Sequence, residues 1–323
     1  MRIVVCNELG GPDALVVEER DAPEPGPGQV RIAVRAAGVN YVDGLIAAGR
    51  YQIKIPPPFT PGSELAGVVD ALGDGVDHLR VGDRVFASVG TGAFAERVVV
   101  RADQAVVIPD TLDFARAASF HQSYCTAWFS FTRRITVAPG EWVLVTGAGG
   151  GVGLAAIDVA RSLGARVIGA ASSAEKRALA EAAGAEATID TTTDDVKVRA
   201  RELSGGGVDI VYDAVGGDVA EPALRALGPD GRFLVIGFAG GAIPRIPLNL
   251  VLLNNRRVVG VDWGGWAMRN VAENRSVVDE VLAEIARGTL RPVAPTERPL
   301  AEAGAVITDL LERRVAGKVV LVP

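Results

Sequence analysis

The stretch VLVTGAGGGVGLAAIDVAR, residues Val143–Arg161, decides the fold. Its valine-rich start predicts a strand, its glycines predict a tight turn, and residues 152–163 predict a helix. Dinucleotide-binding turns follow the order G-x-G-x-x-G, and here alanine replaces the first glycine. The strand–turn–helix context still predicts a pyrophosphate site, because the first turn of a helix offers free N–H donors and the positive end of its dipole. The residues expected to hold the cofactor there are Ala148, Gly150, Gly151, Val152 and Gly153.

The end of the next strand favours NADPH over NADH. An NAD site places an acidic residue there for the ribose 2′-hydroxyl, but the strand ends in alanines that are followed by two serines. Glu175 follows Ser172 by three residues, which is typical of a capping box at a helix start. The hydroxyls of Ser172 and Ser173, with Lys176 beyond them, predict a pocket for a 2′-phosphate. For Arg177, an exposed position on the helix surface is an equal alternative.

Strands and helices alternate after Glu141, whereas the preceding part is rich in short valine-rich strands and proline turns. Strands are predicted in WVLVT, ARVIGA, EATID, VDIVYDAVG, GRFLVIGF and RRVVGVD. Six strands with helical crossovers predict a doubly wound parallel sheet. Gly237 and Phe238 end the fifth strand, where such sheets bind ligands, and are expected near the cofactor. The preceding part predicts a small β-rich barrel or sandwich, so the fold class is α/β.

Composition limits the partners. The chain has 323 residues, enough for two domains, and a formal net charge of −6, which argues against nucleic acid or an anionic membrane as a partner. No apolar run reaches the length of a membrane span, and the N-terminus lacks the pattern of a secretory signal. Cys6 and Cys125 are too few for a disulfide framework. These features predict a cytoplasmic enzyme that acts on a small molecule.

Several segments from both domains carry a family resemblance. They are GVNYVDGLIAAGRYQ, PPFTPGSELAGVV, VLVTGAGGGVGLAAIDVARSLGARVIGAASSAEKRALAEAAGA, VDIVYDAVGG and GFAGGAIPRIPLN. Together the chain resembles the zinc-independent quinone oxidoreductases, the zeta-crystallin-like branch of the medium-chain dehydrogenases/reductases. The resemblance implies a GroES-like domain of residues 1–122 and 264–323, a Rossmann domain of residues 123–263, and an active site in the cleft between them. It also implies a homodimer formed through the strand RRVVGVD.

The same resemblance implies a site without metal. Zinc-dependent relatives place their catalytic ligands at positions that are Asn40, Ser63 and Gln122 here, and their four-cysteine zinc lobe is absent. Zinc is bound by thiolate, imidazole or carboxylate groups, which these three residues do not offer. Without a Lewis acid, hydride transfer to an isolated carbonyl leaves an unstabilised alkoxide. Quinones, enones and enoyl thioesters delocalise the incoming charge, so they need less stabilisation from the protein.

The resemblance also suggests residues around the substrate. Asn40 is expected on the floor of the cleft as a donor to the developing oxyanion, with Asp43 orienting its loop. Tyr51 is expected to bind the acceptor oxygen or to donate a proton, and a simple lining role is the alternative. Gln122 and Trp263 are expected to line the substrate side, although a buried core position is the alternative for Trp263.

Two further cofactor contacts are implied by the resemblance. Thr126 matches a family threonine beside the nicotinamide, with capping of a helix start as the alternative. Lys318 matches a family lysine close to the cofactor, with a solvated side chain as the alternative. The segment that holds His121, Gln122 and Cys125 is polar for this branch and is expected to shape an atypical pocket.

These features predict a metal-free, NADPH-dependent oxidoreductase that transfers hydride to quinones or other α,β-unsaturated carbonyls. Two alternatives stay open: a medium-chain enoyl thioester reductase, and a non-catalytic NADPH-binding protein with a structural role. The glycine turn, together with Asn40 and Tyr51, favours an enzyme.

Overall fold

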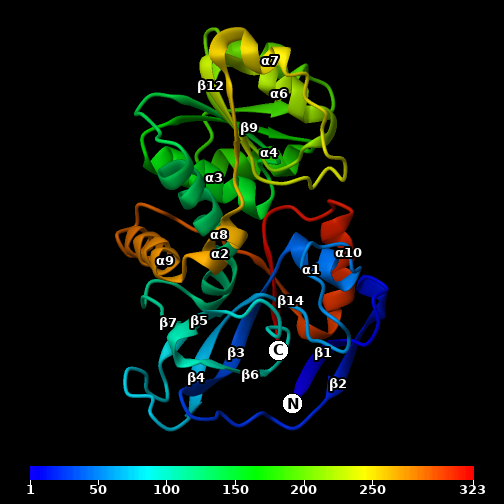
Figure 1. Ribbon diagram of the computed structural model, residues 1–323, viewed down its shortest axis with the longest axis vertical. Coiled ribbons are helices and arrows are strands. Elements are labelled where there is room, and N and C mark those ends of the chain that lie inside the picture. Colours follow the sequence, from blue (N-terminus) through cyan, green and yellow to red (C-terminus); the bar gives the residue numbers. More distant parts are fainter. The chain divides into compact units, whose positions relative to one another are not determined.

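The computed structural model describes all residues from 1 to 323 and divides into two compact units. The first comprises Met1–His121 and Ala294–Pro323, and the second comprises Gln122–Val293. The first boundary falls inside helix α2 (Phe114–Phe129), whose path is drawn in Figure 1. Each unit has its own sheet and its own core.

The first unit is built on a seven-stranded sheet. In order of pairing its strands are β14 (Thr296–Pro299), β15 (Val319–Val322), β3 (Gln29–Val39), β4 (Glu64–Leu72), β5 (Arg84–Ser88) and β7 (Ala105–Val107), with β6 (Arg97–Arg101) paired to β3. β1 (Arg2–Cys6) and β2 (Leu15–Glu19) form a separate antiparallel pair. β3 is central because its alternate residues Val30, Ile32 and Val34 are buried and join a core with Leu65 and Val85. This is the predicted β-rich domain.

Helices of the first unit are short. They are α1 (Tyr41–Ala47), α10 (Ala303–Leu311) and the start of α2. Val306 and Ile307 place the apolar face of α10 on the core of the sheet. Single 3₁₀ turns in the two units cover Pro12–Ala14, Ala102–Gln104, Gly217–Val219, Leu253–Asn255 and Leu300–Glu302.

The second unit confirms the predicted doubly wound sheet. Its strands, all parallel, pair in the order β10 (Ala187–Asp190), β9 (Arg166–Ala171), β8 (Trp142–Thr146), β11 (Val208–Asp213), β12 (Leu227–Val235) and β13 (Arg257–Gly260). The chain order reverses between β8 and β11, and doubly wound sheets bind ligands at such a reversal, beyond the carboxyl ends of the strands. Leu144, Ile168 and Val211 are fully buried, as expected for strands covered on both faces.

Helices cover both faces of this sheet. Figure 1 shows α3 and α4 on one face and α6 on the other. The helices of the second unit, besides the end of α2 and its π-helical extension Ser130–Arg134, are α3 (Gly151–Ser162), α4 (Ala174–Ala182), α5 (Val196–Leu203), α6 (Ala220–Ala226), α7 (Asn249–Leu252), α8 (Trp263–Arg269) and α9 (Val271–Ala286). None of the helices is both long enough and apolar enough to cross a membrane.

Residues 264–293 group with the second unit, whereas the sequence-based division placed them with the first. Their side chains and backbone are bonded to α2 and α3. The Trp128 indole N–H donates to Glu280 Oε2 at 2.6 Å, and the Arg291 backbone N–H donates to Asp158 Oδ2 at 2.6 Å. The other boundary falls between His121 and Gln122, inside α2.

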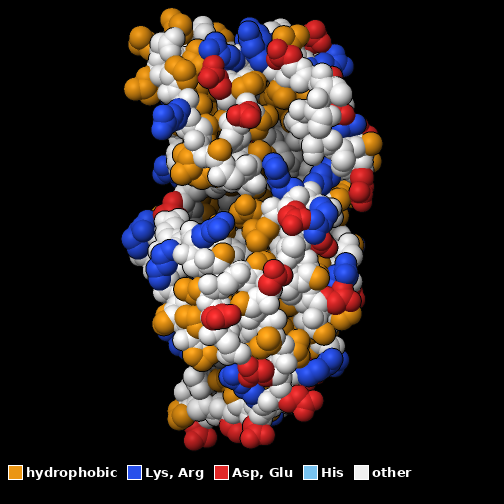
Figure 2. Space-filling view, turned by 90° about the vertical axis from the view of Figure 1, so that its right-hand side faces the viewer, with side chains coloured by type: hydrophobic (Ala, Val, Ile, Leu, Met, Phe, Trp, Pro, Cys, Tyr) orange, Lys and Arg blue, Asp and Glu red, His pale blue; other side chains and the backbone are white.

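Charges of both signs are mixed on the face drawn in Figure 2. On this face, acidic and basic side chains alternate, and no broad area of one sign is visible. This distribution fits the modest net charge of −6.

Asp158 is a buried carboxylate that accepts hydrogen bonds from several residues of the second unit, so its loss should destabilise the fold. It accepts hydrogen bonds from Tyr124 Oη at 3.0 Å, from Arg161 at 2.7 Å and from the Arg291 N–H. Asp158→Ala leaves these donors without their acceptor, so we expect the melting temperature to fall by about 5 °C or more. In Asp279→Ala, which removes an exposed pair on α9, the melting temperature should change by less than about 2 °C. Equal shifts for both variants would contradict this role of Asp158.

Candidate functional site

The glycine turn joins β8 to α3 as the sequence predicts. β8 ends at Thr146, Gly150 is the N-cap, and α3 begins at Gly151. The helix lies so close to the turn that a Cβ on Gly153 would be 2.3 Å from the carbonyl oxygen of Gly147. Glycine is required by this approach, and the free N–H groups of the first helical turn are left to face an anion.

A buried aspartate ties the turn to the neighbouring strand. Asp213 Oδ1 accepts hydrogen bonds from Thr146 Oγ1 at 2.5 Å and from the backbone N–H groups of Val215 and Gly216, both at 3.1 Å. The Gly237 N–H donates to the Asp213 carbonyl oxygen at 3.3 Å. The carboxyl ends of β8, β11 and β12 are thus joined at the reversal of strand order. Asp213 was not among the predicted residues, although an acidic residue that ends a buried strand is a signal in the sequence.

Lys176 lies against the glycine turn. Its Cβ would be 2.3 Å from a Cβ placed on Gly149, so the lysine stem packs directly on the turn. The N-cap of α4 is Ser173, whose Oγ accepts from the Lys176 N–H at 3.3 Å. The predicted capping box of Ser172 and Glu175 does not form, because the helix begins one residue later and Ser173 has the extended backbone of an N-cap. Ser172 is left exposed.

Arg177 has a partner of its own. Its Nη1 lies 2.7 Å from Asp190 Oδ2, at the end of β10, and 3.4 Å from the carbonyl oxygen of Ala171. Hydrogen bonds from Thr192, together with the charge of Arg177, hold the pKa of Asp190 below its usual value. The charge of Arg177 is therefore balanced within the unit, and Lys176 is the cation that packs on the turn.

The remaining predicted residues of the second unit lie in α2, after β12 and in α8. The Thr126 hydroxyl donates to the Gln122 carbonyl oxygen at 2.6 Å late in α2, so it does not cap a helix start. Phe238 is 38% exposed in the segment after β12. Trp263 is 9% exposed, and its indole N–H donates to Asn274 Oδ1 at 3.1 Å.

Four polar side chains gather in the first unit. Asn40 Nδ2 donates to Glu64 Oε1 at 2.8 Å, and the Asn40 backbone N–H donates to Asp43 Oδ2 at 2.8 Å. Lys318 Nζ donates to Asn40 Oδ1 and to Glu64 Oε1, the latter at 3.0 Å. Asn40, Asp43 and Glu64 are all buried, so these bonds are shielded from water.

The register of the sheet brings this cluster together. Asn40 follows β3 and is the N-cap of α1, which places Asp43 at the third helical position of a capping box. Glu64 begins β4 opposite Gly38, and Lys318 precedes β15, in which Val319 lies opposite Val39. Three strand ends therefore converge on the Asn40 amide. The sequence pointed to Asn40 and Asp43, but not to Glu64 or to Lys318 as their neighbour.

Burial controls the titration of this cluster. It raises the pKa of Asp43 to about 7, against the opposing effects of the Asn40 N–H and the Lys318 charge. His121 is also buried, with its ring centroid 5.3 Å from that of Phe86, and burial lowers its pKa. His121 is therefore neutral at physiological pH.

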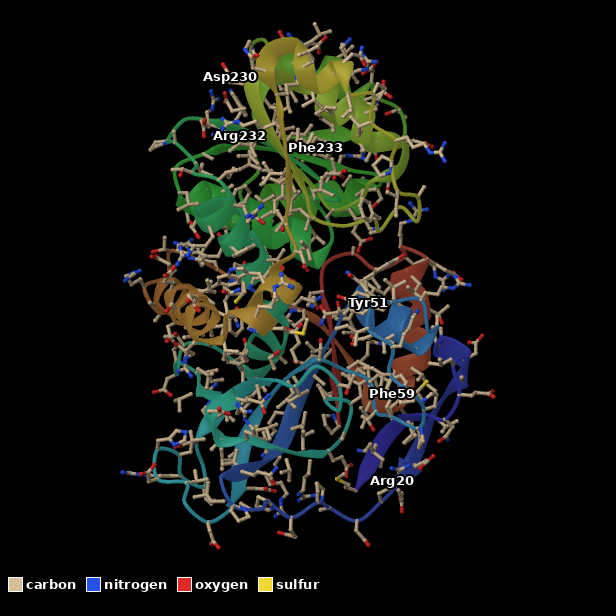
Figure 3. The ribbon with its side chains drawn as sticks, in the orientation of Figure 1. Arg20, Tyr51, Phe59, Asp230, Arg232 and Phe233 are labelled. Carbon is tan, nitrogen blue, oxygen red and sulfur yellow. The ribbon has the colours of Figure 1, made fainter.

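Tyr51 lies on the segment that follows α1. It is partly exposed, and Figure 3 shows it beside that helix in the first unit. The structure thus brings Asn40, Asp43 and Lys318 into one cluster, while Tyr51 belongs to a neighbouring bend.

The residues at the Asn40 cluster do not fit a zinc ion. Asn40 Nδ2 lies 3.5 Å from Ser63 Oγ, so two of the predicted positions do meet, but they offer an amide and a hydroxyl. The ammonium group of Lys318 is bonded to the oxygens of Asn40 and Glu64 that a metal would need. No group of three or more His, Cys, Asp or Glu side chains in the chain could hold a metal ion.

Known proteins are similar to this chain over nearly its whole length. Residues 26–110 match the alcohol dehydrogenase GroES-like domain, and residues 151–283 match the zinc-binding dehydrogenase family. A quinone oxidoreductase-like protein 2 homolog from Nematostella vectensis is 39% identical over 99% of this chain and 88% of its own length. A quinone oxidoreductase from Pseudomonas aeruginosa is 35% identical over 97% of both chains. The quinone oxidoreductase of Thermus thermophilus, with crystal structures that include a complex with NADPH, is 36% identical, with a TM-score of 0.86 over 100% of both chains.

A GroES-like unit and a doubly wound unit together define the medium-chain dehydrogenase/reductase architecture. The chain belongs to the zinc-independent quinone oxidoreductase branch of the medium-chain dehydrogenases/reductases, a family of oxidoreductases.

The raised pKa of Asp43 makes stability depend on pH. The folded value of about 7 exceeds the ordinary 3.8, so the protonated carboxyl contributes stability that is fully present below about pH 4 and is lost as the pH rises through about 7. Asp43→Asn keeps an acceptor for the Asn40 N–H but cannot ionise. The melting temperature of the wild type, relative to this variant, should therefore fall between about pH 4 and about pH 7 and stay level at higher pH. A difference that stays constant over this range would show that Asp43 has an ordinary pKa.

Proposed function

We propose that this protein is an NADPH-dependent oxidoreductase that transfers hydride to quinones or other α,β-unsaturated carbonyls without a metal ion. The observation that carries the proposal is the buried cluster of Asn40, Glu64 and Lys318, which offers hydrogen-bond donors and a fixed cation in place of metal ligands. The quinone oxidoreductases among the relatives support the same class of reaction.

The second unit is the proposed NADPH site. The glycine turn and the start of α3 suit a pyrophosphate, because their N–H groups are free to bind an anion. Ser172 and Lys176 suit the 2′-phosphate, because β9 is followed by hydroxyls rather than by a carboxylate and the lysine stem packs on the turn. The other proposed cofactor contacts in this unit are Thr126, Ala148, Gly150, Gly151, Val152, Gly153, Ser173, Gly237 and Phe238.

Bound NADPH supplies the hydride, and the protein must stabilise the negative charge that develops on the acceptor oxygen. Asn40 is the proposed donor. One of its Nδ2 hydrogens is bonded to Glu64 at 2.8 Å, while the other faces Ser63 Oγ at 3.5 Å, a long contact that an acceptor oxygen can replace. A quinone or enone spreads the charge over its conjugated system, so a donor of this strength is sufficient.

Three further residues have proposed roles near the substrate. Tyr51 is the proposed second donor to the acceptor oxygen or the proton source, and Gln122 and Trp263 are proposed to line the substrate side. Asp43 is proposed to orient the Asn40 loop through the bond from the Asn40 backbone N–H.

Cofactor preference tests the proposed 2′-phosphate contact. Lys176→Ala should raise the Kd of NADPH about 10- to 100-fold, because one charge-assisted hydrogen bond contributes about 1.5–3 kcal/mol. The Kd of NADH should stay within about twofold. Lys197→Ala, at an exposed position on α5, is the matched control and should alter neither value. Fluorescence titration of both cofactors measures these constants, and equal wild-type affinity for NADH and NADPH would rule out a 2′-phosphate pocket.

An acceptor panel tests the reaction. NADPH oxidation is followed with a benzoquinone, a conjugated enone and crotonyl thioester in parallel. Asn40→Ala and Tyr51→Phe should each lower kcat about 10²-fold while the Kd of NADPH stays within about twofold, because one oriented donor acts mainly in the transition state. Asn7→Ala, an exposed asparagine of the same unit, is the control.

Each outcome of the panel separates the alternatives. Turnover of the thioester alone would identify an enoyl thioester reductase. NADPH binding without turnover of any acceptor would favour the non-catalytic alternative. Full turnover in both Asn40→Ala and Tyr51→Phe would place the chemistry on other residues.

We also propose that two copies pair through β13. This strand ends the six-stranded sheet, so one of its edges has unpaired backbone groups. Val258 in β13 is 45% exposed. Leu248 and Leu252, in the segment that precedes β13, are 80% and 78% exposed. Sedimentation at micromolar concentration should give a dimer, and a Val258→Asp variant should shift the protein toward monomer. A monomeric wild type would contradict the pairing.

A further inference from the structure

Lys318 is a largely buried cation whose donors are directed at three oxygens. It bonds to Asn40 Oδ1, to Glu64 Oε1 at 3.0 Å and to the Val39 carbonyl oxygen at 3.3 Å. The side chains of Lys318 and Glu64 are only 11% and 1% exposed. An ammonium group has three hydrogens to donate, and three acceptors surround it here. These contacts hold the Lys318 side chain in one position.

The charges of this pair determine which way round the Asn40 amide lies. The two ends of an asparagine amide have nearly the same shape, but Oδ1 only accepts hydrogen bonds and Nδ2 only donates them. Lysine can only donate and an ionised carboxylate can only accept. Oδ1 must therefore face Lys318, and Nδ2 must face Glu64. A flipped amide would set two donors against each other and two acceptors against each other.

We propose that Lys318, acting with Glu64, is a positioning residue that fixes the Asn40 amide with its second Nδ2 hydrogen directed to the substrate side. The inference rests on the proposed function for the role of that hydrogen. The Ser63 contact at 3.5 Å marks where this hydrogen lies in the absence of an acceptor. The role differs from the cofactor contact expected from the sequence, because here Lys318 acts through Asn40.

Replacing Lys318 or Glu64 by a neutral residue should allow the Asn40 amide to flip. Lys318→Met leaves Asn40 Oδ1 without this donor and leaves the buried Glu64 carboxylate without its cation. Glu64→Gln replaces the carboxylate by an amide that can turn either end toward Asn40. The double variant Lys318→Met with Glu64→Gln removes both charges of the ion pair together. It therefore tests the proposal even if Lys318→Met alone fails to fold.

Kinetics separate positioning from cofactor binding. In Lys318→Met, in Glu64→Gln and in the double variant, kcat should fall about 10- to 100-fold while the Kd of NADPH stays within about twofold. Lys318→Arg should recover a large part of kcat, because a guanidinium can also donate to both oxygens. Lys197→Met, at the exposed α5 position, should behave like the wild type. A raised Kd of NADPH with unchanged kcat would overturn the proposal and make Lys318 a cofactor contact, and wild-type kcat in the double variant would also overturn it.

A wild type that reduces none of the acceptors would contradict the proposed function. The orientation of the Asn40 amide can still be tested then, by NMR spectroscopy. In protein labelled with ¹⁵N-asparagine, the Asn40 side-chain signals are assigned by their loss in Asn40→Asp. One Asn40 amide proton is bonded to a buried carboxylate, so it should resonate downfield and exchange slowly with solvent. Both properties should be lost in the double variant and kept in Lys197→Met. Unchanged Asn40 signals in the double variant would overturn the proposed positioning.

Discussion

The ion pair of Lys318 and Glu64 is the interaction on which the candidate catalytic cluster depends. Two buried charges are expensive to remove from water, and they are tolerated only where hydrogen bonds satisfy the remaining donors and acceptors. Here Glu64 Oε1 also accepts from Asn40, and Lys318 also donates to Asn40 and to a strand carbonyl. Because Asn40, Glu64 and Lys318 lie at the ends of three different strands, the ion pair holds the Asn40 loop to the sheet.

A buried ammonium group and a metal ion stabilise charge in different ways. A zinc ion binds a substrate oxygen directly in an open coordination position, whereas Lys318 has its hydrogen bonds directed at protein oxygens. The cluster therefore suits a reaction in which the acceptor itself spreads most of the charge and one directional donor completes its stabilisation. This is the physical basis of the proposed preference for conjugated acceptors.

Close packing, rather than charge, sets the geometry of the second unit. The helix α3 approaches the glycine turn within a distance that excludes any side chain at position 153, and Lys176 approaches it within a distance that excludes one at position 149. Asp213 then joins the end of β11 to the end of β8 through the hydrogen bond from Thr146, and it accepts two more from the backbone that follows it. A site assembled from such contacts is rigid before any ligand arrives, which lowers the cost of ordering it on binding.

Sequence alone determined the features that depend on neighbouring residues. The strand, turn and helix around Gly153 and the six parallel strands follow from local periodicity. The role of Asp43 in orienting the Asn40 loop came from the family resemblance. Tertiary structure decided the rest. Lys318 lies 278 residues from Asn40, and only the register of β3, β4 and β15 brings it to that amide. Similarly, α4 is capped by Ser173 rather than Ser172, and residues 264–293 join the second unit. These outcomes depend on backbone angles and on packing between distant segments, which no local pattern of residues encodes.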